Sequence, residues 1–129
     1  MTRTESEQLF SRAVADAAEA IAETLGAHPP RGNQPYPISE VLPVLVRSHL
    51  ALQQALEQHP GSVAVTAEGK ENPLGGELAG LMSYLQLLSV LYRGLDEFPD
   101  WMKVNASRNL SAVSLAARRV RDRARRLMR

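Results

Sequence analysis

Apolar residues recur at steps of three and four in four separate stretches of the chain, and this spacing predicts four amphipathic helices. The first helix is expected over residues 4–25, with an apolar stripe of Phe10, Val14, Ala17, Ile21 and Leu25. Thr4 and Glu7 form a capping-box pattern at its start, and Gly26 suits the position that follows a helix.

A second helix is expected over residues 39–58, with a stripe of Leu42, Leu45, His49, Leu52 and Leu56. Pro43 falls in the first turn, where a helix tolerates proline. The segment 28–37 before it contains four prolines and cannot continue a helix. We interpret that segment as a stiff connection between the first two helices, with a proline-rich ligand for another protein's aromatic groove as the alternative.

The third helix is expected over residues 73–95, after an Asn-Pro start, with a seven-residue repeat made by Leu74, Leu78, Leu81, Leu85, Leu88, Tyr92 and Leu95. Met82, Leu87, Val90 and Leu91 widen its apolar face, so this helix should be central or form a subunit interface. Gly76 and Gly80 would let another backbone approach closely. Residues 62–66 before it alternate and suggest a short extended arm or hairpin.

The fourth helix is expected over residues 99–128, with a stripe of Ala106, Leu110, Val113, Ala117, Val120, Ala124 and Leu127. Few aromatic and β-branched residues and many Ala and Leu also favour helices over a sheet. The predicted fold is therefore a single all-α domain over residues 1–129, a four-helix bundle with a Pro-rich connection between helices 1 and 2.

Charge is segregated along this chain. Residues 118–129 contain seven of the fifteen Lys and Arg residues and one of the fourteen Asp and Glu residues, so they carry about +6 while the other residues carry about −5. The unbroken apolar stripe predicts that these arginines end an ordered, basic amphipathic helix.

The candidate binding residues are these arginines: Arg118, Arg119, Arg121, Arg123, Arg125, Arg126 and Arg129. Guanidinium groups suit phosphate, which makes DNA a candidate partner through non-specific phosphate contacts. An acidic protein surface, in another protein or in a homo-oligomer, is the alternative. The arginines could also contact the acids of the first helix (Glu5, Glu7, Asp16, Glu19 and Glu23) or remain solvated.

No residue constellation indicates catalysis, a cofactor or a metal, so we expect no enzyme. There is no cysteine. His28, His49 and His59 lack ligand-like spacing, and Asp96, Glu97 and Asp100 fit helix capping better than an acid/base pair. Trp101 should pack the corner between the last two helices or serve as a partner anchor. Without a membrane-length apolar stretch or a secretory signal, a cytoplasmic protein is expected.

A helix that ends near 55–58 is followed by Gly61, by the β-like residues 63–66, and by the segment 69–74 (Gly-Lys-Glu-Asn-Pro-Leu) that opens a long helix. Through these features, residues 52–91 resemble the core of phage terminase small subunits. The resemblance implies a non-catalytic, ring-forming protein that binds viral DNA and hands it to a packaging motor. The function expected from the sequence is thus an oligomeric nucleic-acid-binding protein, with a helical adaptor that docks on an acidic partner as the alternative.

Overall fold

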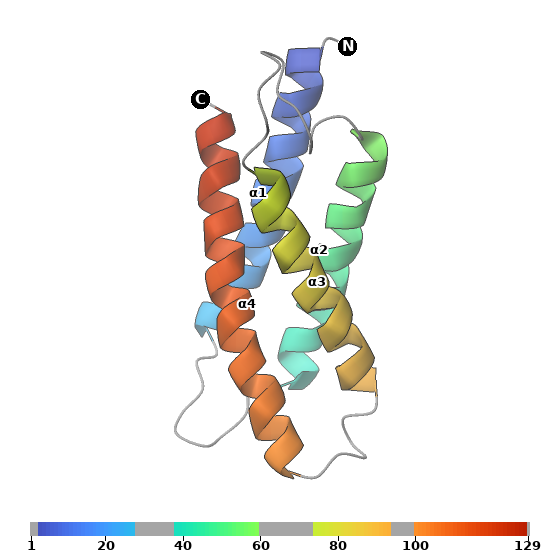
Figure 1. Cartoon of the computed structure of the whole chain (residues 1–129), viewed down its shortest axis with the longest axis vertical. Helices are drawn as coiled ribbons and strands as arrows, with labels where there is room; N and C mark the ends of the chain where they lie inside the picture. The colour runs from blue at the N-terminus through green and yellow to red at the C-terminus, as the bar shows by residue number, and fades with distance from the viewer. Residues whose placement is uncertain (1–2, 28–37, 60–73, 94–99, 129) are drawn as a thin grey trace.

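The computed structural model describes residues 3–27, 38–59, 74–93 and 100–128 (Figure 1). They form four helices: α1 (Arg3–Ala27), α2 (Ile38–Gln58), α3 (Leu74–Arg93) and α4 (Asp100–Leu127). Each bound lies within two residues of the predicted one. The all-α prediction is therefore confirmed for these residues. The predictions on 28–37, 62–66, His28, Asp96, Glu97 and Arg129, and on the side chains of Tyr92, Trp101 and Ala106, lie outside the described residues.

The helices form an up-down-up-down bundle in which α1 and α3 run in one direction and α2 and α4 run in the other (Figure 1). The most extensive helix pair is α1 with α4, followed by α1 with α2 and α3 with α4, and α2 with α3 is the smallest of these four main pairs. The end of α4 lies beside the first half of α1, since Gln8 Nε2 donates to the Leu127 carbonyl oxygen at 3.3 Å. The arginine-rich segment is therefore part of the bundle wall.

One hydrophobic core joins the four helices, and most of the predicted stripes face it. The stripe of α1 is wholly buried, as are the five described leucines of the α3 repeat. On α4 the core residues are Leu110, Val113, Ala117, Val120 and Ala124. The helical, core-facing register of the arginine-rich segment is confirmed, because buried and charged positions alternate in it at helical spacing.

The inward face of α2 is rotated from the predicted stripe. Leu42, His49 and Leu56 are only half-buried, whereas Ser48 and Ala55 are 5% and 3% exposed. These two small residues lie on the side of α2 that packs on α1. The apolar pattern missed them because alanine and serine add little to a hydrophobic stripe.

The prediction that Gly26 follows the first helix was wrong, and the described bundle makes no close approach at Gly76 or Gly80. Gly26 lies inside α1, and its backbone does not adopt the left-handed conformation of a helix-ending glycine. At Gly76 and Gly80, an added Cβ would meet no atom within 4 Å. Neither glycine therefore allows another helix of the described bundle to approach closely. Each of the three tolerates a side chain sterically.

Several large apolar side chains remain outside the core. Leu9, Val46, Leu50, Tyr84, Leu87 and Leu115 are 41–54% exposed. Leu87, which the sequence placed on a widened apolar face of the third helix, thus contributes little to the described core. Isolated exposed leucines are common on protein surfaces, so these residues alone indicate no particular partner.

Candidate functional site

The last three turns of α4 carry the predicted basic residues around a fixed apolar ridge. Val120 and Ala124 are fully buried against the core, and this orientation determines where every neighbouring arginine points. Successive residues of an α-helix are rotated by about 100°. The arginines are consequently distributed over three sides of α4: the side toward α1, the side toward α3, and the side that faces solvent.

Two arginines on the α1 side share one carboxylate. Arg121 Nη1 and Arg125 Nη2 each donate to Glu19 Oε2 at 3.1 Å. Arg121 Nε also donates to Asp122 Oδ1 at 3.0 Å. The hydrogen bond to Asp122, with a further one to Glu19, outweighs desolvation and raises the pKa of Arg121 above its ordinary value. One of the sequence interpretations, contact with the acids of the first helix, therefore holds for these two arginines.

On the α3 side, Arg123 forms a two-pronged ion pair with Glu77. Its Nε and Nη2 atoms donate to the two carboxylate oxygens at 3.2 Å and 3.0 Å. Hydrogen bonding to Glu77 raises the pKa of Arg123. This fork geometry is the one in which a guanidinium binds a carboxylate most specifically. Sequence reasoning did not single out Glu77.

The remaining described arginines face solvent. Arg118, Arg119 and Arg126 are exposed, and no ion pair engages them within the part of the chain that the structure describes. We call these three residues the exposed arginine set. Arg119 and Arg126 are seven residues apart, so they lie on one side of α4 about 10 Å apart along its axis. The seven predicted binding residues thus divide into three that pair within the chain, three that face solvent, and Arg129 outside the described residues.

We predict that the paired and exposed arginines respond differently to neutralisation. Arg123→Gln should lower the urea midpoint of unfolding at low salt, because Glu77 loses its partner, and concentrated salt should shrink the difference. Arg119→Gln, the matched loss of charge one turn earlier, should leave the midpoint unchanged. Urea titrations followed by circular dichroism at two salt concentrations measure this. Equal urea midpoints for the two variants at low salt would contradict the division into paired and exposed arginines.

His59 has a structural contact that the sequence did not reveal. Its Nδ1 lies 2.7 Å from Ser6 Oγ, and its ring meets the edge of Phe10 at a centroid distance of 6.4 Å. The end of α2 is thereby fixed to the start of α1. A hydroxyl beside an imidazole can form part of a nucleophilic site, but such a site also needs a cavity for substrate. A groove lies between α1 and α2, but neither Ser6 nor His59 lines it, so we interpret the pair as a packing contact.

Other classes of site receive no support from the described residues. Among them, no group of three or more His, Cys, Asp or Glu residues could hold a metal ion. None of the described helices is long and apolar enough to cross a membrane.

Comparison with known proteins gives no assignment. No family model matches the chain, and no curated protein or solved structure matches it significantly.

Proposed function

We propose that this chain is a non-catalytic, oligomeric nucleic-acid-binding protein whose exposed arginine set contacts phosphates. The observation that carries the proposal is that three guanidinium groups on the last turns of α4 face solvent and form no ion pair within the part of the chain that the structure describes. Neighbouring arginines of the same helix are neutralised by Glu19 and Glu77. Arg118, Arg119 and Arg126 thus form a cationic surface on a helix that the packing of the bundle holds in place.

The chemistry of this surface favours phosphate contacts over base reading. Each phosphate that a cation neutralises releases condensed counterions, which contributes a slope of about −0.9 to the dependence of log affinity on log salt for duplex DNA. Base edges are read mainly by side chains with fixed donor and acceptor patterns, such as Asn and Gln, in addition to Arg. Residues 118–129 contain no Asn or Gln. We therefore propose binding with little sequence preference.

A narrower form of the proposal is the DNA-binding small subunit of a phage terminase. It rests only on the resemblance of residues 52–91 given above. Such a subunit would present duplex DNA to a packaging motor, so this form predicts tighter binding to duplex than to single-stranded DNA of equal length. The general proposal of nucleic-acid binding does not require a preference for duplex over single-stranded DNA.

The experiment is a salt series of binding titrations with fluorescent duplex DNA. The variant that changes Arg118, Arg119 and Arg126 to Gln should bind at least about tenfold more weakly, and its salt slope should be shallower by about 2 to 3. The loss follows from removing three phosphate-binding cations while leaving the ion pairs to Glu19 and Glu77 intact.

Arg12→Gln is the control, because it removes one exposed positive charge from α1 and leaves the exposed arginine set intact. It should reduce affinity little, and both variants should retain the helical content of the parent. Absence of binding by the parent at low salt, or an unchanged slope in the triple variant, would reject the proposal.

One observation favours a second candidate, an adaptor that docks on an acidic protein. Within the chain, arginines of this same helix already bind carboxylates in one-pronged and two-pronged geometry. The exposed arginine set could bind acids of a partner in the same way. A pull-down that yields one stoichiometric protein and survives nuclease treatment, with loss on neutralising the same three arginines, would favour this candidate.

A further inference from the structure

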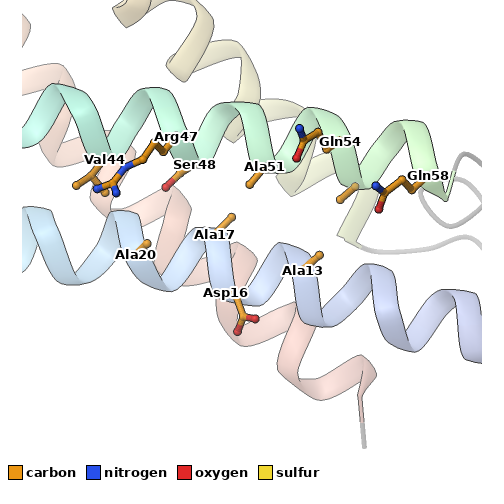
Figure 2. A pocket seen from close by; sticks show the side chains of 11 residues that line it. Ala13, Asp16, Ala17, Ala20, Val44, Arg47, Ser48, Ala51, Gln54 and Gln58 are labelled. Carbon is orange, nitrogen blue, oxygen red and sulfur yellow. The ribbon is translucent and has the colours of Figure 1, made fainter.

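A shallow groove of about 530 Å³ runs along the outer face of α1 and α2 (Figure 2). Its lining is mostly small: Ala13, Ala17, Ala20, Ala51 and Ala55. Longer side chains border it, among them Asp16 on α1 and Arg47, Gln54 and Gln58 on α2. The groove opens on the side of α1 and α2 away from α3 and α4 (Figure 2).

Ser48 supplies an unused hydrogen-bonding group within this groove. The residue is only 5% exposed, and its hydroxyl points into the groove between the two helices (Figure 2). The hydroxyl makes no hydrogen bond within the described part of the chain. Because the groove is open to solvent, this hydroxyl is available to hydrogen-bond to water in the single chain or to a polar group that docks in the groove.

The two walls of the groove carry opposite charges. Asp16 on the α1 wall and Arg47 on the α2 wall are both exposed. Arg47 Nε donates only to the carbonyl oxygen of Pro43 on its own helix at 3.4 Å, and neither residue forms an ion pair in the described part of the chain. A surface with one acid and one base on opposite walls is complementary to a copy of itself.

We propose that this groove is a self-association face on which a second copy of the chain docks about a two-fold axis parallel to the helices. Such an axis places α1 of one copy against α2 of the other at the same level. It stacks the alanine stripes of the two copies, whose small side chains permit close helix approach. It also places the hydroxyl of Ser48 near the polar side chains that border the groove of the second copy.

The register of the helices supports this axis. Ser6 is level with His59, because their side chains are hydrogen-bonded. Ten residues farther along antiparallel helices, Asp16 is level with His49, so Arg47 is displaced by about 3 Å along the axis. The second copy's Arg47 would therefore lie opposite Asp16, within the reach of an arginine side chain. A two-fold axis perpendicular to the helices would instead place α1 against α1 and α2 against α2, so that like charges would face each other.

The proposal specifies the oligomer of the proposed function, but it does not depend on nucleic-acid binding. Its experiment contains no nucleic acid, so failure of one proposal is distinguishable from failure of the other. Sedimentation velocity across a wide concentration range measures the dimer dissociation constant of the full chain. Because Asp16 and Arg47 are exposed, circular dichroism should show unchanged helicity in every variant.

Charge reversal distinguishes this interface from any other. Asp16→Arg and Arg47→Asp should each raise the dissociation constant by about tenfold or more, since each places like charges in contact. The double variant restores opposite charges with their positions exchanged and should recover dimerisation. Glu57→Arg is the control and should have little effect, because it makes the same charge change at an exposed residue that does not line the groove and lies nine residues from Ser48, on the opposite side of α2. A monomeric parent, an unaffected single reversal, or a double variant that fails to recover would overturn the proposal.

Discussion

A chain that ends at Ala117 is expected to lose its stable fold together with any binding. The truncation removes Val120 and Ala124, which are fully buried, and Leu127 and Met128, which pack on the core. Lost burial of these four side chains alone should cost about 5 kcal/mol, comparable to the whole stability of many domains of this size. Thermal unfolding followed by circular dichroism should show a weak, non-cooperative transition in place of a sharp one.

The loss should extend to α1, because the end of α4 covers the first half of that helix. Gln8 would lose its bond to the Leu127 carbonyl oxygen, and Glu19 would lose Arg121 and Arg125. The buried side chains of Phe10 and Val14 would gain contact with water. Truncation thus disrupts the packing of α4 on α1, the most extensive helix pair of the bundle. It should therefore lower the stability of the fold more than removal of an appended tail would.

The control is the full-length variant in which Arg118, Arg119 and Arg126 are Gln. It loses the exposed arginine set and keeps every buried residue of α4, so its melting temperature should match that of the parent. A truncated chain that unfolds cooperatively at the parent's temperature would show that residues 118–129 are a separable tail. That result would contradict the packing described for Val120 and Ala124.

The helices were predictable because their determinants are local. The leucine repeat of α3 correctly identified Leu74, Leu78, Leu81, Leu85 and Leu88 as core residues. The stripe from Leu110 to Ala124 likewise predicted an ordered helix through the arginines. Periodicity within one segment gives the side of a helix that must be buried, whatever its neighbours are.

The pairing of the arginines was not predictable, because it depends on which helices lie beside α4. Arg118 shares a flank of the helix with Arg121 and Arg125, but only the latter two form ion pairs with Glu19. Glu77 contacts Arg123 because α3 and α4 are antiparallel neighbours in a particular register. The groove between α1 and α2 has the same origin, since Ser48 and Asp16 come together only through tertiary packing.

Leu81→Ala should lower the free energy of unfolding by about 2 to 5 kcal/mol, the range for deleting a fully buried leucine side chain. Leu81 is 0% exposed at the centre of α3, so its removal leaves a cavity that the surrounding helices can fill only in part. The chemically identical change Leu87→Ala, on the same helix, removes a side chain that is 54% exposed. It should change the free energy by no more than about 0.5 kcal/mol.

Urea titrations of the two variants and the parent, at one low protein concentration, give the comparison. Both variants have the same helix propensity change, so the difference between them isolates burial. Equal destabilisation would mean that Leu87 is also buried, as the widened apolar face of α3 first suggested. Repeating the Leu87→Ala titration at high protein concentration separates the causes: a loss of stability that appears only there indicates a second copy covering α3, whereas a loss independent of concentration indicates burial within the chain.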